Sequence, residues 1–222
     1  GVNNFLGKNM IGTFYQPNVV INDTIFLKSL PKREMICGYA EMLKHSLISN
    51  KNFFIFLKNN FKAILNLKPQ IIKKAIFNSC KIKKVIVEKD EKENNLRKTL
   101  NYGHTFAHAF ESTLGYTKKL NHGEAVLLGI LAASKFSNKE KLLPKNELKL
   151  IENHLGELKY NDLKYYFKKQ NINKILDFMI KDKKNNSKDI NLILLKKMAK
   201  PILDNRYSKN KVKNFLISLI DK

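Results

Sequence analysis

The sequence predicts a mainly α-helical protein with a short β-containing lead-in, and two patterns carry that prediction. From about residue 31 onward, apolar residues recur at three- and four-residue steps, as they do on the buried face of a helix. Before that point the chain holds turn residues and a β-branched run, VVIND at 19–23, which predicts a short buried strand. Hydrophobic residues make up 43% of the chain, a share typical of a globular domain. We therefore expect one unit over residues 1–30 and a helical domain over 31–222.

The expected helices have recognisable boundaries. The first follows Pro31, a residue that suits the first turn of a helix, and its apolar face is formed by Ile36, Ala40, Leu43 and Leu47. Amphipathic helices with lysine on the polar face follow at 51–66 and 69–89. Further helices are expected from near Leu96 to a terminating Gly115, and at 123–139, 144–156 and 208–220, with a lysine- and asparagine-rich loop at 181–189. The helix at 123–139 is the most apolar, so we expect it at the centre of the core.

The net charge of +23 raises the alternative of a nucleic-acid-binding protein. Of the 42 Lys and Arg residues, however, only three are arginine, the residue whose planar fork suits base and phosphate recognition. The lysines are scattered among many Asn and Ile residues, and all three residue types have AT-rich codons. We therefore attribute the charge to mutational bias and expect no nucleic-acid partner.

Neither a membrane span nor a disulfide framework is indicated. The longest strongly apolar run, residues 125–133, is far shorter than the roughly 20 residues that cross a bilayer. The opening residues GVNNFLGKNM contain no charged leader followed by an apolar stretch. Cys37 and Cys80 form neither a framework nor a CxxC pair, which favours a reducing, cytoplasmic location.

Three of the five histidines are concentrated in one window. His104 and His108 are four residues apart, so on a helix they project from the same face, with Glu111 three residues further on. His122 stands just before the apolar helix. Neutral imidazoles suit Zn²⁺ and related ions. A partly buried, hydrogen-bonded histidine pair is the alternative interpretation of the HxxxH spacing.

A polar stripe extends from these histidines toward the N-terminus. Its members are spaced by four, three and four residues, which places them on one helix face: Arg97, Asn101, His104 and His108. Such a stripe indicates a site for an anionic ligand next to a metal, although Arg97 could also be an ordinary surface charge.

A second cluster of polar residues lies on the first predicted helix. Glu41 and Lys44 are three residues apart on an otherwise apolar segment, so they would project together into the interior or a cleft. A buried carboxylate needs a metal or a cation as partner. The alternative is an exposed Glu–Lys pair on the helix surface.

Five blocks of the chain together resemble the 3-dehydroquinate synthases in order and nearly in spacing. They are LGKNMIGTFYQPNVVIND, SLPKREMICGYAEMLKHSLI, DEKENNLRKTLNYGHTFAHAFE, NHGEAVLLGI and KDKKNN, and the resemblance runs from residue 1 to about 195. It implies the multi-helical C-terminal domain of that fold over 31–222, preceded over 1–30 by the tail end of a Rossmann-like NAD-binding domain. The chain contains no glycine-rich phosphate-binding turn. We therefore expect a truncated chain, most of whose NAD-binding domain would precede Gly1, and no activity from it alone.

The resemblance also implies roles for individual residues. The implied metal ligands are Glu41, His104 and His122, and the implied catalytic residues are Lys44, Glu93 and His108. The substrate would be contacted by Asn9, Lys44, Lys83, Arg97, Asn101, His108 and Lys183, with Lys184 as an alternative to the last. NAD would contact Lys8, Phe26, Leu27, Lys28 and Ser29.

The implied reaction converts 3-deoxy-D-arabino-heptulosonate 7-phosphate to 3-dehydroquinate and phosphate, a step of the shikimate pathway. It proceeds by transient oxidation with NAD, phosphate elimination, reduction and an intramolecular aldol closure. The resemblance thus implies NAD and Zn²⁺ as cofactors, with Co²⁺ as an alternative ion, a small anionic sugar phosphate as substrate, and a homodimer. A sister sugar phosphate cyclase is the alternative, since it would keep the metal residues and change the substrate contacts.

Overall fold

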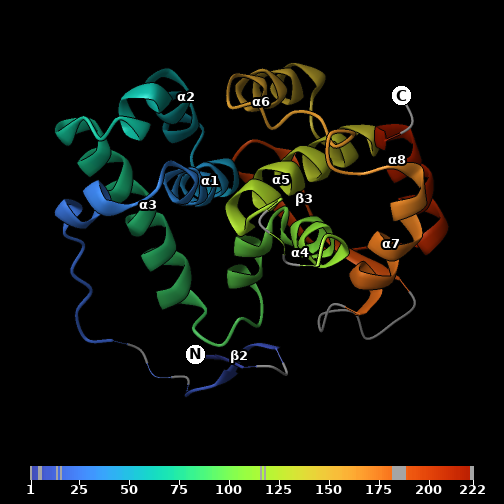
Figure 1. Cartoon of the computed structure of the whole chain (residues 1–222), viewed down its shortest axis with the longest axis horizontal. Coiled ribbons are helices and arrows are strands. Elements are labelled where there is room, and N and C mark those ends of the chain that lie inside the picture. The colour runs from blue at the N-terminus through green and yellow to red at the C-terminus, as the bar shows by residue number, and fades with distance from the viewer. Residues whose placement is uncertain are drawn as a thin grey trace.

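The computed structural model describes residues 2–4, 7–13, 15, 17–115, 117, 119–181 and 189–220, with only the backbone described for 3, 4 and 7–10. Helices dominate this part of the chain, as the sequence predicts (Figure 1). The α-helices are α1 (Lys32–Ser49), α2 (Lys51–Leu65), α3 (Pro69–Lys89), α4 (His104–Thr113), α5 (His122–Lys139), α6 (Lys145–Glu157), α7 (Ile172–Lys181) and α8 (Lys209–Ile220). Short 3-10 helices occur at η1 (Thr24–Ser29), η2 (Leu96–Asn101) and η3 (Lys169–Asn171).

Two antiparallel hairpins accompany the helices. In the lead-in, β1 (Val2–Asn4) pairs with β2 (Gly7–Ile11). Near the C-terminus, β3 (Ile190–Lys197) pairs with β4 (Lys200–Tyr207), a hairpin that the helical periodicity did not predict. The strand β3 packs against α5, and the backbone N–H of Leu195 donates a hydrogen bond to the Ser137 hydroxyl at 3.1 Å. The second hairpin therefore belongs to the helical body.

The prediction of a buried strand at 19–23 is wrong. The structure assigns no strand there, and Val19, Val20 and Ile21 are 72%, 69% and 87% exposed. A strand is stabilised by hydrogen bonds to a neighbouring strand. Among the described residues, the sheets contain only the pairs β1–β2 and β3–β4, so no strand pairs with this segment. The segment instead runs without regular secondary structure at the periphery of the helical body (Figure 1), and its apolar side chains are exposed.

Helix α5 lies at the centre of the core, as its composition predicts. Most of its side chains are buried, and it packs against α1, α4, α6 and β3. Among the described helices, none combines the length and the hydropathy that crossing a bilayer requires.

Two close backbone approaches seat the neighbouring helices against α5. A Cβ atom added to Gly129 would lie 2.2 Å from the carbonyl oxygen of Gly103, and one added to Gly123 would lie 2.1 Å from the Cα of Cys37. Both distances are far below contact distance, so only glycine fits at either position. The chain reaches the first approach through a left-handed turn, with φ of 79° at Gly103.

That turn also corrects the prediction of one continuous helix from Leu96 to Gly115. The structure contains the 3-10 helix η2, the left-handed Gly103, and then α4, which is followed by a second left-handed glycine at Gly115. Arg97 and Asn101 therefore lie on a different element from His104 and His108, and the four residues do not form one helix face.

We predict that Gly129→Ala lowers the free energy of unfolding by about 1–3 kcal/mol, because the added methyl forces α4 away from α5. Gly38→Ala is the matched control. Gly38 is also helical, and an added Cβ would meet nothing within 4 Å, so its helix propensity should leave stability unchanged or raise it by up to about 1 kcal/mol. Urea titrations measure both. Equal stability of the two variants would contradict the account of the α4–α5 contact.

Candidate metal centre

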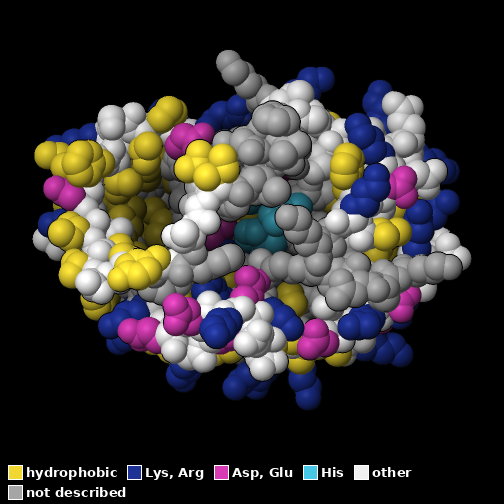
Figure 2. Space-filling view, turned by 90° about the horizontal axis from the view of Figure 1, so that it is seen from below, with side chains coloured by type: hydrophobic (Ala, Val, Ile, Leu, Met, Phe, Trp, Pro, Cys, Tyr) yellow, Lys and Arg dark blue, Asp and Glu magenta, His cyan; other side chains and the backbone are white. Residues whose placement is uncertain are grey.

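Three potential metal ligands from three different helices meet at one point. Glu41 comes from α1, His104 begins α4 and His122 begins α5. One ligand atom of each lies within 4.8 Å of the others. Within the part of the chain that the structure describes, this is the one group of three or more His, Cys, Asp or Glu residues close enough to share an ion. Figure 2 shows histidine side chains in a hollow at the centre of the face seen from below.

The two glycine approaches explain why these three residues meet. Gly103 immediately precedes His104, so its contact with Gly129 fixes where α4 begins relative to α5. Gly123 immediately follows His122, and its contact with Cys37 places the start of α5 against α1 one turn before Glu41. Each ligand thus lies within about one helical turn of a backbone contact.

The two carboxylate oxygens of Glu41 have different neighbours. Its Oε2 accepts a hydrogen bond from Lys44 Nζ at 2.7 Å, and its Oε1 lies 3.5 Å from His104 Nε2. Burial by itself would raise the pKa of Glu41, but the His104 imidazole and the Lys44 ammonium outweigh it and hold the pKa well below its usual value. The carboxylate is therefore ionised at neutral pH, as a metal ligand must be.

One atom of Glu41 indicates that a metal fits. Oε1 is buried and has no hydrogen-bond partner among the described residues, although a buried carboxylate oxygen normally has one. A cation beside it would satisfy this oxygen. One carboxylate and two imidazoles form a donor set that suits Zn²⁺ and leaves a further coordination position for substrate.

The histidines are placed to act as neutral ligands. Burial lowers the pKa of His104, which keeps its ring deprotonated at Nε2 or Nδ1 at neutral pH. The three rings of this window lie close together, with centroids 5.4 Å apart for His104 and His108, 5.6 Å for His104 and His122, and 6.0 Å for His108 and His122. His108 therefore borders the centre without belonging to the group of three.

His154 shows how a structural histidine in the same chain differs. It is fully buried on α6, its Nε2 is 2.6 Å from the Tyr39 hydroxyl, and its ring packs edge-on against Phe54 and Phe61. This ring is held by aromatic core contacts and by polar contacts at both nitrogens, since its Nδ1 lies 3.3 Å from Glu157 Oε2. The contrast with His104 and His122 favours a ligand role for the latter two.

A tight loop between α3 and η2 carries Glu93, one of the predicted site residues, and Arg97 follows it on η2. The Asp90 carboxylate accepts hydrogen bonds from the backbone N–H groups of Asn94, Asn95 and Arg97 at 2.8–2.9 Å. These bonds, above all that from Arg97, lower the pKa of Asp90. The loop thereby holds Glu93, whose φ is 59°, and its Oε1 accepts a hydrogen bond from Asn101 Nδ2 at 2.6 Å. The Arg97 guanidinium donates to the Glu91 carbonyl oxygen.

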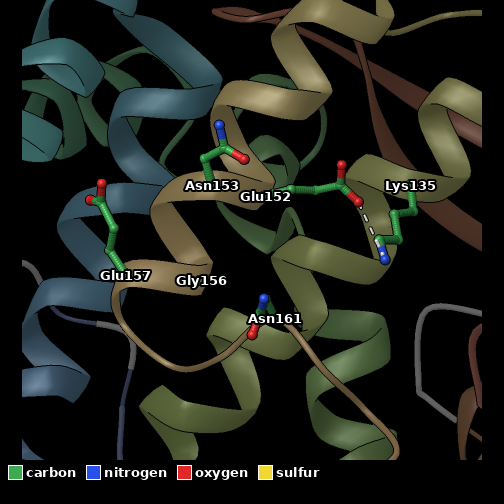
Figure 3. Close-up of a pocket in the computed structure, with 6 residues that line it drawn as sticks. All are labelled: Lys135, Glu152, Asn153, Gly156, Glu157 and Asn161. Atoms are coloured by element: carbon green, nitrogen blue, oxygen red, sulfur yellow. Dashed lines mark ion pairs between the residues drawn. The ribbon is translucent and has the colours of Figure 1, made fainter.

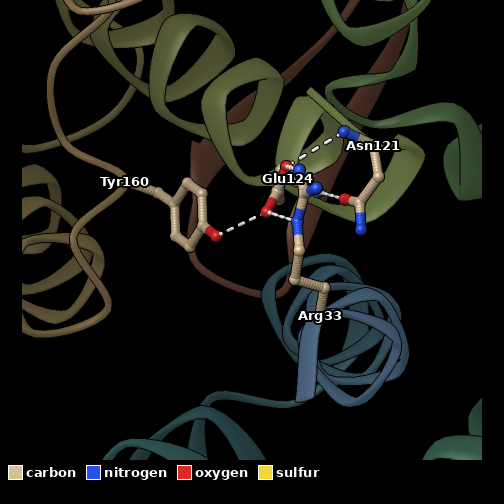
Figure 4. Close-up of polar contacts among 4 residues, drawn as sticks. All are labelled: Arg33, Asn121, Glu124 and Tyr160. Atoms are coloured by element: carbon tan, nitrogen blue, oxygen red, sulfur yellow. Dashed lines mark hydrogen bonds and ion pairs between the residues drawn. The ribbon is translucent and has the colours of Figure 1, made fainter. Parts of the chain in front are cut away.

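An ion pair between Arg33 and Glu124 stabilises the start of α5, where His122 lies. Arg33 donates to both carboxylate oxygens of Glu124, at 2.8 and 2.5 Å, and Tyr160 OH donates to Oε1 at 3.0 Å (Figure 4). Glu124 and Asn121 also form a reciprocal capping box across the first turn of α5. Burial opposes ionisation of Glu124, but these partners lower its pKa below the usual value. The network joins α1, α5 and the segment after α6.

The remaining predicted site residues lie at several places in the fold. Lys83 is exposed on α3, and Phe26, Lys28 and Ser29 are exposed on η1, where Leu27 instead packs against the core. Lys8 and Asn9 lie on β2, but their side chains are not among those described. Lys183 and Lys184 lie outside the described residues.

A hollow of about 550 Å³ elsewhere on the surface is a separate feature (Figure 3). It lies between α5 and α6 and is lined by Lys135, Glu152, Asn153, Gly156, Glu157 and Asn161. Lys135 is 13 residues after His122 on α5, so about 20 Å of helix separates this hollow from the metal ligands. Its lining shares no residue with the site predicted from the sequence.

Sequence reasoning missed several residues that support the site. Glu111 Oε2 lies 2.8 Å from His122 Nδ1. No role was predicted for Glu111 from the sequence, although its position seven residues after His104 placed it on the same helix face as the histidines. The capping box had the recognisable pattern Asn121-x-x-Glu124. The contacts of Arg33 with Glu124 and of His45 with Ser79 join residues far apart in the chain, so no local pattern could have indicated them.

Comparison with known proteins identifies the family to which the chain belongs. A family model described as "3-dehydroquinate synthase C-terminal" matches residues 38–185, and one described as "3-dehydroquinate synthase N-terminal" matches residues 1–37. A 3-dehydroquinate synthase of Pelagibacter ubique is 54% identical over 217 residues, which cover 97% of this chain and 59% of the relative. One from Campylobacter fetus is 42% identical over 216 residues, covering 97% and 60%. The chain thus spans about 60% of the length of these relatives.

Solved structures show the same fold. A 2-deoxy-scyllo-inosose synthase complexed with carbaglucose-6-phosphate, NAD⁺ and Co²⁺ has a TM-score of 0.81 and 25% identity, with 96% of this chain and 60% of that chain covered. A 2-epi-5-epi-valiolone synthase from Streptomyces hygroscopicus with NAD⁺ and Zn²⁺ bound has a TM-score of 0.82 and 21% identity, with 100% and 61% covered.

We predict a pH-dependent loss of stability from His45, which is buried beside the site and has Nδ1 2.8 Å from the Ser79 hydroxyl. Burial, reinforced by the Lys44 charge, lowers the pKa of His45 to about 4. Below the unfolded-state pKa of about 6.5 the unfolded chain binds a proton that the folded chain does not. Stability should therefore fall by about 2 kcal/mol from this residue between pH 7 and pH 5.

Urea titrations at both pH values, with EDTA present, measure this effect. His45→Gln has no titrating group there, so its loss of stability between pH 7 and pH 5 should be about 2 kcal/mol smaller than that of the unchanged chain. Equal losses would show that His45 is not held in its neutral form.

Proposed function

This chain belongs to the 3-dehydroquinate synthase family, and from that premise we propose that it provides the metal- and substrate-binding part of a 3-dehydroquinate synthase. The substrate is 3-deoxy-D-arabino-heptulosonate 7-phosphate, and the products are 3-dehydroquinate and phosphate. The observation that carries the proposal is the convergence of Glu41, His104 and His122 from three helices, with one ligand atom of each within 4.8 Å of the others.

These three residues would hold Zn²⁺, with Co²⁺ as an alternative ion. The ionised carboxylate of Glu41 and the imidazoles of His104 and His122 would supply the donors, and the buried Oε1 of Glu41 would gain the partner it lacks among the described residues. When bound, the ion acts as a Lewis acid that polarises the hydroxyl to be oxidised and later the carbonyl oxygen. The similar fold of the 2-deoxy-scyllo-inosose synthase that carries NAD⁺ and Co²⁺ supports this assignment.

Three residues beside the metal ligands provide charge and proton transfer. Lys44 is buried with its ammonium on Glu41, so it neutralises part of the carboxylate charge and offers donors to an anionic substrate. His108 borders the centre, with its ring within 6.0 Å of both metal histidines, and can accept or donate a proton there. Glu93, which accepts a hydrogen bond from Asn101 and lies in the loop closed by Asp90, would be a second proton acceptor.

A ring of basic and amide groups would bind the substrate's carboxylate, hydroxyls and phosphate. We assign this role to Asn9, Lys83, Arg97, Asn101 and Lys183. Positive charge suits a substrate that carries two anionic groups, and several donors acting together hold flexible intermediates in reactive geometry. NAD, which supplies the hydride acceptor when bound, would contact Lys8 and residues 26–29. We also propose that the protein forms a homodimer. A cytoplasmic location is proposed as well, in keeping with the free thiols of Cys37 and Cys80.

The proposal predicts one zinc ion per chain and zinc-dependent chemistry. Metal analysis after dialysis should find about one zinc in the unchanged chain and in His108→Asn, and little zinc in His104→Ala. His108→Asn is a close control, because it removes a neighbouring imidazole without removing a proposed ligand. With NAD and the N-terminal half of the Pelagibacter ubique relative supplied, phosphate release from the substrate should stop on chelation and resume with zinc.

Two results would contradict the proposal. Equal zinc content in the unchanged chain and in His104→Ala would exclude the three-residue site. Absence of zinc from both, together with DNA binding that weakens steeply with salt, would favour the nucleic-acid alternative that the net charge of +23 raises.

A further inference from the structure

One carboxylate outside the group of three contacts a proposed ligand directly. Glu111 Oε2, on α4, lies 2.8 Å from His122 Nδ1 at the start of α5. The Glu111 side chain is 13% exposed and that of His122 is 35% exposed. The pair therefore joins two helices at the edge of the site, on the same face of α4 as His104 and His108.

Glu111 is not itself placed to be a ligand. Glu41, His104 and His122 each offer one atom within 4.8 Å of the other two, and Glu111 falls outside that group. Its carboxylate instead contacts Nδ1 of His122, which leaves Nε2 as the ring nitrogen that can face an ion. Any effect of Glu111 on a metal must therefore act through the His122 ring.

The contact determines which nitrogen of His122 is free. A carboxylate accepts a hydrogen bond, so the contact requires a proton on Nδ1 of His122, and in the neutral ring that proton leaves the Nε2 lone pair available for a metal. His104 has the same orientation, with Nδ1 toward the Tyr102 carbonyl oxygen at 3.4 Å and Nε2 toward Glu41. His122 is the more exposed of the two rings, 35% against 12%, and so depends more on a directed contact to hold its orientation.

We infer that Glu111 is the positioning residue of the metal centre: it fixes the His122 ring and its Nδ1–H tautomer so that Nε2 faces the ion. The inference rests on the proposed function, because it presupposes that His122 is a ligand. A carboxylate behind a ligating histidine orients the ring and raises its basicity, and loss of such a partner typically weakens metal binding by about 10- to 100-fold.

Two measurements on the folded chain test the inference. Competition with a chromophoric chelator gives the zinc dissociation constant, which should rise about 10- to 100-fold in Glu111→Ala and less in Glu111→Gln, whose amide oxygen can still accept the hydrogen bond. Glu152→Ala is the matched control, since it removes a carboxylate that pairs with Lys135, and its zinc affinity should be unchanged. Long-range ¹H–¹⁵N spectra of the zinc-free chain should show His122 protonated on Nδ1, and this state should be lost in Glu111→Ala.

The outcomes separate this inference from the proposed function. If the unchanged chain binds one zinc and Glu111→Ala binds it equally tightly with the same His122 tautomer, the positioning role is wrong while the metal site stands. If the unchanged chain binds no zinc, the metal site and the inference fail together. A loss of affinity in Glu111→Ala that Glu111→Gln partly restores is the result that a role in folding alone would not produce, provided that circular dichroism shows both variants folded.

Discussion

The candidate metal centre depends on the close backbone contacts that α5 makes with α4 and α1. Gly103 meets Gly129, and Gly123 meets Cys37, at distances that exclude a side chain at either α5 position. Side-chain packing alone would leave helices about 8–10 Å apart with room to slide. Backbone contact removes that freedom at the points where the ligands enter. The packing of the three helices therefore determines the positions of Glu41, His104 and His122 relative to one another.

The electrostatics of the site follow from bringing these helices together. A buried carboxylate is costly without partners, and Glu41 has Lys44 on one oxygen and a histidine near the other. Other carboxylates around Glu41 also contact hydrogen-bonding groups. Glu124 pairs with Arg33 at the start of α5, Asp90 closes the loop that contains Glu93, and Glu111 contacts His122. In a chain with a net charge of +23, many of the acidic residues near the site serve to place cationic or hydrogen-bonding groups.

The sequence indicated the composition of the site better than its surroundings. The resemblance to the 3-dehydroquinate synthases implied the set Glu41, His104 and His122, which the structure brings together. Spacing alone indicated His104 with His108, because local periodicity reports only which side chains share one helix face. The β3–β4 hairpin was not predicted. Its strand β3 packs against α5, a contact between distant parts of the chain that local sequence patterns do not reveal. The break at Gly103 was missed because a left-handed turn looks like any other glycine in a helical pattern. The run at 19–23 had the composition of a strand but no partner to pair with.

The central claim is that Glu41, His104 and His122 together coordinate a metal ion, and X-ray absorption at the zinc edge of the zinc-loaded chain tests it most directly. The account predicts only nitrogen and oxygen neighbours at about 2.0–2.2 Å, with the multiple-scattering pattern of two imidazoles. A sulfur neighbour at about 2.3 Å would assign the ion to a cysteine, and a spectrum without imidazole scattering would place it away from both histidines. Either spectrum would contradict the account.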